Sequence, residues 1–202
     1  AGMTVLIQDD RELRVLLLDL GEGTTDISVH RDSSPVFTSS LPVGGAQVTS
    51  DLSIMLKTPL QAAREIKHSA GCAWLPLVAG NEPVIIPGVG GRPPIALDRR
   101  KIAGIIQPRV AEIFGLARDR LEQQDILRGI GGGVVLTGGG AALPGVVDLA
   151  QEVFGLPARV GTPLPEAGLV ALGSGPEFAT AVGLIEYARQ HLSIEEPDRR
   201  RH

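Results

Sequence analysis

The sequence predicts an α/β protein in which two strands end in glycine-rich turns and a small α+β unit is inserted between them. First, an apolar run at 13–20 leads directly into DLGEGTTD at 19–26. Second, the strand pattern at 133–137 ends in Thr137 and three glycines, and a helical pattern follows. Third, apolar residues continue through the proline- and glycine-rich stretch 76–97, which favours a compact lobe over a linker. Strand, glycine turn and helix in that order are typical of ligand sites in α/β proteins.

The first part of the chain predicts a three-stranded meander followed by two helices. Apolar runs, alternation and turn residues place the strands at 13–20, 26–31 and 35–41. Apolar residues at fourfold spacing predict a helix over 45–57. A shorter helix is expected to begin at Pro59 and to end before Gly71, since proline suits a first turn and glycine an end.

The second part predicts a long helix and then alternating strands and helices. Short strands are expected at 77–79 and 84–86, inside the proline- and glycine-rich stretch. The long helix spans 98–124, with Asp98 as its N-cap and Pro108 as a residue that kinks or splits it. The remaining elements are expected at 133–137, 142–154, 158–160 and 176–191. The polar tail from 193 is expected to be disordered.

The first glycine turn has the chemistry of a phosphate site. Gly21 and Gly23 can take φ > 0 and leave no Cβ in the way of a ligand, and the amides from Gly21 to Thr24 would form a concave nest for phosphate oxygens. Thr24 and Thr25 add hydroxyl donors, and Asp19 would hold a hydrated Mg²⁺ ion. The alternative is a tight hairpin with glycine at its corner.

The second glycine turn, Gly138 to Gly140, favours a nucleotide but matches neither common phosphate motif. No Gly-Lys-Ser/Thr follows it, so it is not a P-loop, and its glycines are consecutive rather than spaced as in the dinucleotide fingerprint. The alternative is a loop whose glycines let a helix pack close to a sheet.

Composition excludes several classes of function. Charged residues make up 21% and the net charge is −4, which argues against a nucleic-acid surface. A single cysteine, Cys72, cannot form an internal disulfide and fits a reducing compartment. The four histidines lack metal-ligand spacing. No apolar run approaches the length of about 20 residues that a membrane span needs.

The two turns together resemble the actin-like ATPase superfamily. DLGEGTTD is similar to its second phosphate loop, VVLTGGGAALPGV to its adenosine loop, and GPEFATAVGLIEYA at 175–188 to the helix after its second connecting motif. Within the superfamily the chain resembles the bacterial cell-division family FtsA from about residue 5 to about 190. The stretches that carry this resemblance are 42–73, 89–97, 105–113, 161–169 and 179–187.

The resemblance implies an actin/DnaK-like fold with a ribonuclease H-type subdomain IIA and a small inserted α+β subdomain IIB. Subdomain IIA would comprise 1–50 and 116–202, and subdomain IIB 51–115. The chain resembles only the second half of the family, so we expect a fragment. The family's C-terminal membrane helix has no counterpart in it.

ATP and Mg²⁺ are the cofactors that the resemblance implies for the intact protein. They would contact Asp19, Gly21, Glu22, Gly23, Thr24, Thr25, Lys67, Gly138, Gly139 and Gly140. The chain departs from the family pattern at Glu22, where a glycine is usual, and at Arg64, where a ribose-contacting Glu is usual. Hydrolysis by the intact protein is left open. The isolated chain is expected to retain no nucleotide and to lack ATPase activity, because phosphoryl transfer needs groups on both sides of the nucleotide.

The resemblance also implies a partner. Lys101, Arg109 and Glu112 match positions with which the family binds the C-terminal tail of the filament protein FtsZ, and helix geometry puts all three on one face. The alternative is an ordinary solvated helix face. Other divisome proteins and a second copy of the chain are further expected partners. The intact protein is expected in the cytoplasm, at the inner face of the membrane of the division site. The competing hypotheses are half of a sugar or acetate kinase, a DnaK-type chaperone, or a PilM- or MreB-like protein.

Overall fold

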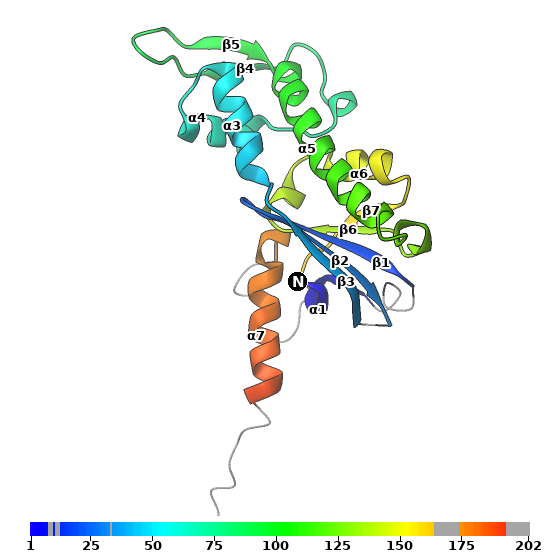
Figure 1. Ribbon diagram of the computed structural model, residues 1–202. Helices are drawn as coiled ribbons and strands as arrows, with labels where there is room; N and C mark the ends of the chain where they lie inside the picture. Colours follow the sequence, from blue (N-terminus) through cyan, green and yellow to red (C-terminus); the bar gives the residue numbers. More distant parts are fainter. Residues whose placement is uncertain (8–9, 11–12, 33, 164–173, 193–202) are drawn as a thin grey trace, which may run out of the picture.

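The centre of the molecule is a five-stranded mixed sheet with the strand order β3-β2-β1-β6-β7 (Figure 1). The computed structural model describes residues 1–7, 10, 13–32, 34–163 and 174–192. Strands β1 and β2 pair antiparallel, as do β2 and β3, whereas β6 pairs parallel with both β1 and β7. The predicted meander is therefore confirmed. The strands are β1 (Val15–Leu20), β2 (Thr25–Arg31), β3 (Ser34–Leu41), β6 (Val134–Thr137) and β7 (Ala158–Val160).

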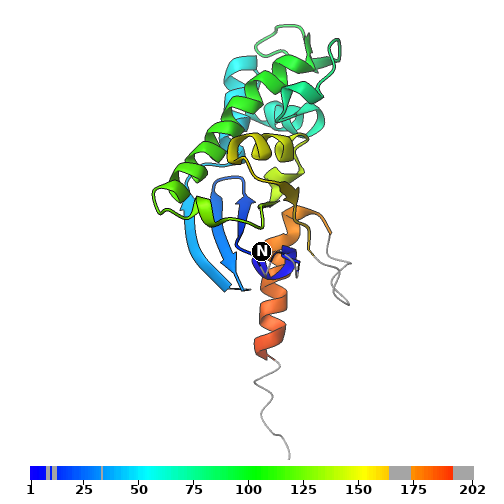
Figure 2. The same cartoon turned by 90° about the vertical axis from the view of Figure 1, so that its right-hand side faces the viewer.

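Apolar layers cover both faces of the sheet, which is why β1 is a continuous apolar run. Leu16 and Leu18 belong to the larger core with α3, α5 and α6, whereas Val15 and Leu17 belong to a smaller core with α1 and α7 (Figures 1 and 2). Successive strand residues point to opposite faces, so both sets must be apolar. Helix α1 was not predicted. The helices are α1 (Gly2–Val5), α3 (Gly45–Leu56), α5 (Arg99–Glu122), α6 (Val146–Phe154) and α7 (Ala179–Leu192).

A small lobe stands at one end of the sheet and contains α4 (Leu60–Ala70) and a hairpin of β4 (Pro83–Ile86) and β5 (Ile95–Asp98) (Figure 1). The strand predicted at 77–79 is wrong, because Leu75–Leu77 form a short 3-10 helix, η1, that contains a proline. Proline has no N–H to donate to a strand ladder and suits a helical first turn. The partner of β4 is instead β5, which the sequence did not predict.

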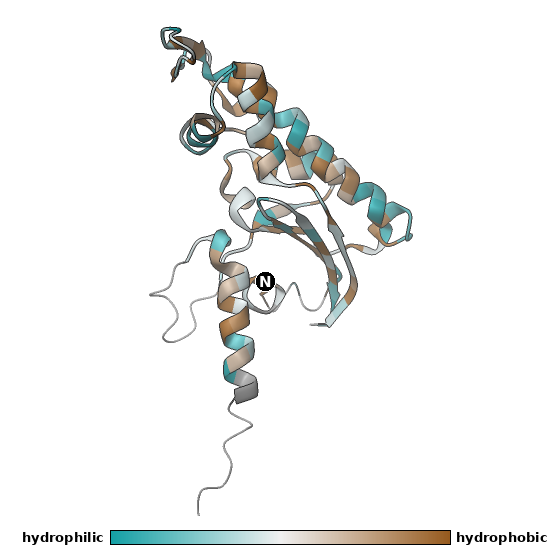
Figure 3. Cartoon of the chain, turned by 60° about the vertical axis from the view of Figure 1, so that its left-hand side comes forward, coloured by the Kyte–Doolittle hydropathy of each residue, from teal (hydrophilic) through white to brown (hydrophobic). Residues whose placement is uncertain are grey.

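Helix α5 is one continuous helix from the small lobe to the sheet, so of the two predicted effects of Pro108, a kink or a split, the split does not occur. Both Pro108 and Gly104, whose carbonyl loses its partner, are exposed, and water can satisfy that carbonyl. Apolar and polar segments alternate along α5 in Figure 3. The N-cap is confirmed: Asp98 Oδ1 accepts from the Arg100 N–H at 2.9 Å. Hydrogen bonds from the Arg100 and Asn81 amides lower the pKa of Asp98.

Three further short 3-10 helices complete the description: η2 (Leu127–Gly129), η3 (Gly139–Ala142) and η5 (Pro176–Phe178). The helix expected from residue 142 begins only at Val146, after Gly145 with φ +77°. The predicted subdomain limits, residues 51 and 115, fall inside helices α3 and α5 respectively. The division of the chain into subdomains IIA and IIB stays a prediction. The tail at 193–202 lies outside the described residues.

Candidate functional site

The two glycine turns lie side by side because the strands that carry them are parallel neighbours. Asp19 of β1 pairs with Thr137 of β6 in the ladder, so both strands end at the same edge of the sheet. One turn follows β1 at 21–24 and the other follows β6 at 138–140. This edge, at the carboxyl ends of parallel strands, is where ligands bind in open α/β sheets.

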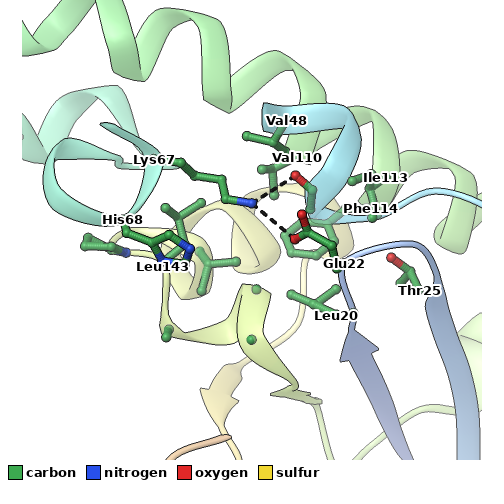
Figure 4. A pocket seen from close by; sticks show the side chains of 18 residues that line it. Leu20, Glu22, Thr25, Val48, Lys67, His68, Val110, Ile113, Phe114 and Leu143 are labelled. Atoms are coloured by element: carbon green, nitrogen blue, oxygen red, sulfur yellow. Dashed lines mark hydrogen bonds and ion pairs between the residues drawn. The ribbon is translucent and has the colours of Figure 1, made fainter. Parts of the chain in front are cut away.

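A cavity of about 280 Å³ opens between this edge and the small lobe (Figure 4). Of the residues predicted to bind nucleotide, six line it: Gly21, Glu22, Thr25, Lys67, Gly139 and Gly140. Four do not line it: Asp19, Gly23, Thr24 and Gly138. The fold therefore collects residues from two turns and from α4 around one space, as the sequence predicted for most of them.

The turn after β1 is closed by its own backbone. The Gly21 N–H donates to the Thr24 carbonyl at 2.9 Å, so this amide is not available to a phosphate nest. Neither Gly21 nor Gly23 uses the positive φ that glycine permits. Position 21 requires glycine for a steric reason instead, because a Cβ there would lie 2.9 Å from the Thr24 carbonyl oxygen. The buried Thr25 hydroxyl donates to the Val43 carbonyl at 2.9 Å and so holds β2 to the start of α3.

The same turn is fastened to the N-terminus of α3. The Gly45 N–H donates to the Gly21 carbonyl at 2.9 Å, and the Ala46 N–H to the Glu22 carbonyl at 2.7 Å. A Cβ on Gly44 would lie 2.5 Å from the Gly21 oxygen, which explains the glycine at position 44. Both glycines line the cavity and were missed as site residues, although the pair follows the predicted third strand directly.

The turn after β6 contains the one glycine of the two turns with a left-handed backbone. Gly138 has φ +80°, and a Cβ there would lie 2.4 Å from Asp19 Oδ1. A Cβ on Gly140 would lie 2.7 Å from the Leu20 Cβ. Gly139 differs, because nothing lies within 4 Å of its Cβ position, and it faces the cavity. The close approach of the two turns therefore requires Gly138 and Gly140.

Asp19 lies beside the cavity rather than in it. Its Oδ2 accepts from the Thr180 hydroxyl at 2.7 Å, which ties β1 to the start of α7. Within the described ranges no group of three or more His, Cys, Asp or Glu side chains is placed to hold a metal ion. A single carboxylate fits Mg²⁺, which keeps several waters and takes its other ligands from substrate phosphates.

Glu22 and Arg64, the two positions at which the resemblance implied a departure from the family pattern, contact each other. Arg64 Nη2 lies 3.3 Å from Glu22 Oε1, and Lys67 Nζ lies 3.3 Å from Glu22 Oε2. Lys67 also donates to the Gly45 carbonyl at 3.0 Å (Figure 4). An acidic side chain of the turn after β1 is thus paired with two cations of α4, of which Lys67 lines the cavity.

The interior of the cavity is apolar and was not predicted. Buried side chains of α3, α5 and α6 surround it: Val48, Val110, Ile113, Phe114 and Val146. Val48, Val110 and Ile113 are buried on α3 and α5, in keeping with the helical periodicity of the apolar residues there. Periodicity cannot show that part of a core is unfilled, because that depends on how three helices meet. The site is therefore an apolar chamber with a charged, glycine-lined entrance.

The predicted partner residues do not form one free charged face. Arg109 makes two bonds to Asp51 of α3, from Nε at 2.6 Å and from Nη2 at 3.1 Å, and Nη1 lies 2.5 Å from Glu112 Oε2. The hydrogen bond to Asp51 raises the pKa of Arg109. Lys101, by contrast, is exposed. Arg109 therefore makes its bidentate contact with a carboxylate inside the chain, between α3 and α5.

Comparison with solved structures defines the class of protein. The chain superposes on MreB5 of Spiroplasma citri bound to ADP with a TM-score of 0.70 and 18% identity, over 95% of this chain and 58% of that one. It superposes on a structure described as the PilM-PilN type IV pilus biogenesis complex with a TM-score of 0.64 and 22% identity, over 89% of this chain and 47% of that one. The chain therefore has an actin-like ATPase fold, as predicted.

Sequence comparison identifies the family. The family model described as "Cell division protein FtsA" matches residues 16–183, and the chain belongs to this family. It is 40% identical to the FtsA of Pseudomonas aeruginosa over 193 residues, which are 96% of this chain and 46% of that protein. It is 38% identical to the FtsA of Escherichia coli over 203 residues, covering 96% and 48% respectively. The chain spans about half the length of these relatives.

These findings decide between the hypotheses left open above. MreB and PilM structures share the fold of this chain, whereas the family to which the chain belongs is FtsA. None of the helices described in this structure has the length and apolarity that crossing a bilayer requires.

Proposed function

We propose that this chain forms one wall of an ATP-binding cleft in a cell-division protein, and that its small lobe receives the C-terminal tail of FtsZ. In the intact protein this would help to anchor the division ring to the cytoplasmic face of the inner membrane. The observation that carries the nucleotide proposal is the shared cavity, in which both glycine turns and Lys67 meet. Membership of the FtsA family supports the division role.

In the proposed nucleotide site, different residues would contact different parts of the nucleotide. Lys67 provides a hydrogen-bond donor to the nucleotide from α4, and the open backbone at Gly139 leaves room for the nucleoside. Asp19 would hold Mg²⁺, which neutralises phosphate charge when bound. The apolar chamber excludes water from beneath the ligand. Thr25 contributes by fixing the turn, since its hydroxyl proton is used by the Val43 carbonyl.

The nucleotide proposal is tested by titrating the isotope-labelled chain with Mg-ATP and following amide shifts. With one wall of the cleft present we expect weak binding, with a Kd on the order of 1 mM, and no measurable hydrolysis. The shifts should cluster at 21–24 and 138–143. Sodium triphosphate and adenosine, titrated separately, should move the first and the second group respectively. A folded sample that shows no shift in either group with Mg-ATP would refute the site.

The partner proposal places the FtsZ tail on the small lobe, with Lys101 as its accessible cation. Arg109 takes part only if a tail carboxylate replaces Asp51, because its donors are already paired. Lys101→Glu should weaken binding of a synthetic FtsZ tail peptide about fivefold. Arg128→Glu provides the matched control, since Arg128 is exposed in η2 at the opposite end of α5. Equal affinities for both variants would place the tail elsewhere.

A further inference from the structure

The start of α7 is fastened to the strand ends that carry the two glycine turns. The Pro176 carbonyl, in η5 directly before α7, accepts from the Gly138 N–H at 3.0 Å and lies 3.2 Å from the Thr137 hydroxyl. Four residues further on, the Thr180 hydroxyl donates to Asp19 Oδ2 at 2.7 Å. The first two contacts hold the end of β6 and the turn after it, whereas the third holds a side chain, the carboxylate of Asp19.

The backbone that carries the Thr180 hydroxyl is itself fixed. The neighbouring residue Ala179 is fully buried in the smaller core, which also contains Val15 of β1 and Val135 of β6. The Ala179 carbonyl accepts from the Thr4 hydroxyl at 3.1 Å. A hydroxyl presented by a packed helix start is held more precisely than one presented by a loop. Thr180 is therefore placed to orient the carboxylate to which it donates.

The bond from Thr180 decides which oxygen of Asp19 is left for a cation. Oδ2 accepts from the hydroxyl, whereas no group in the described ranges donates to Oδ1. Oδ1 lies against the turn after β6, where a Cβ on Gly138 would be 2.4 Å from it. A carboxylate with one oxygen held and the other unpaired suits Mg²⁺, which takes one or two carboxylates and keeps several waters.

We propose that Thr180 is a positioning residue for the cation of the nucleotide: its hydroxyl holds the Asp19 carboxylate in the orientation that offers Oδ1 to Mg²⁺. This inference rests on the proposed nucleotide site, because Mg²⁺ would take its other ligands from phosphates and water. Thr180 does not line the cavity and acts through Asp19. Carboxylates that bind metals are commonly held by such a hydrogen bond, and its loss weakens metal binding.

The variant Thr180→Val tests this inference, because it keeps the shape of the side chain and removes the donor. The ATP affinity of each variant is measured by amide shifts twice, with Mg²⁺ and without it in the presence of a chelator. Mg²⁺ should strengthen ATP binding by the unaltered chain about fivefold, and binding by Thr180→Val hardly at all. ATP without metal should bind equally to both, which a variant with a damaged fold would not do.

Two further variants separate the hydroxyl from the rest of the side chain. Thr180→Ser keeps the donor and should restore the full effect of Mg²⁺. Thr38→Val makes the same replacement at an exposed position of β3 that does not line the cavity, and should leave the effect unchanged. The proposal is overturned if Mg²⁺ strengthens ATP binding by Thr180→Val as it does for the unaltered chain. It is also overturned if Thr180→Ser shows the same loss as Thr180→Val, since the hydroxyl would then not be responsible.

A second measurement separates this proposal from the nucleotide site on which it rests. The unfolding free energies of Thr180→Val, Asp19→Ala and the double variant form a cycle that needs no ligand. If the two side chains are coupled, the double variant loses less than the sum of the single losses; additive losses overturn the contact itself. If the unaltered chain binds no ATP, the nucleotide site fails, and coupling would show only a structural bond between β1 and α7. If ATP binds but Mg²⁺ does not strengthen its binding, the site stands and the role of Thr180 fails.

Discussion

The two glycine turns look alike in sequence but need their glycines for different reasons. After β6, Gly138 combines φ +80° with close contact to Asp19 and to the Leu20 backbone. After β1, Gly21 has an ordinary φ and is needed only because the turn is tight. Each turn also contains a glycine with nothing within 4 Å of its Cβ position, Gly23 and Gly139. A glycine motif therefore mixes positions that the fold requires with positions that leave space.

The largest effect is expected where conformation and close packing act together. Gly138→Ala should lower the free energy of unfolding by about 4 kcal/mol, because alanine is strained at this φ and its Cβ would overlap the Leu20 backbone. Urea unfolding followed by circular dichroism measures the loss. Gly155→Ala is the control, since Gly155 has φ +64° but open space around it, and should lose only about 1 kcal/mol. Equal losses would show that the close approach of the two turns contributes nothing.

A smaller effect is expected where the turn after β1 meets α3. The Cβ of Gly44→Ala would lie 2.5 Å from the Gly21 oxygen and 2.8 Å from the Glu22 oxygen. The turn would have to move, and we expect a loss of about 2 kcal/mol. Hydrogen exchange of the Gly45 and Ala46 amides, which donate to these carbonyls, should accelerate in the variant. Gly80→Ala, with open space around it, should change neither quantity.

Most of the fold could be predicted because its signals are local. Alternation and continuous apolar runs identified β1, β2 and β3, and the apolar stripe of α5 is buried as expected at Ile102, Ile106 and Val110. The hairpin of the small lobe was predicted only in part. Its second strand, β5, follows two prolines and becomes a strand by pairing with β4, so pairing rather than local pattern decides it.

The candidate site was predictable only in part of its members, since six of the ten proposed nucleotide residues line the cavity, and its contacts were not predictable. Helix geometry places Arg109 on a face, yet it cannot show that Asp51, 58 residues away, packs against that face. The same is true of Glu22 and Arg64, which the sequence identified as separate departures from the family pattern and which pair in the structure. The apolar chamber is a third case, because its volume depends on how α3, α5 and α6 meet.

The smallest effects on stability are expected at Gly139 and Gly23, whose Cβ positions have open space around them. At one of them we nevertheless expect a clear effect on nucleotide binding. Gly139→Ala and Gly23→Ala should each change the free energy of unfolding by less than about 0.5 kcal/mol, since neither Cβ meets another atom. Only Gly139 lines the cavity, so only Gly139→Ala should weaken Mg-ATP binding in the amide-shift titration. Gly23→Ala is its matched control. If both variants bind ATP as the unaltered chain does, the nucleoside does not approach the turn after β6. If Gly23→Ala alone weakens binding, the phosphates approach the turn after β1 from outside the cavity.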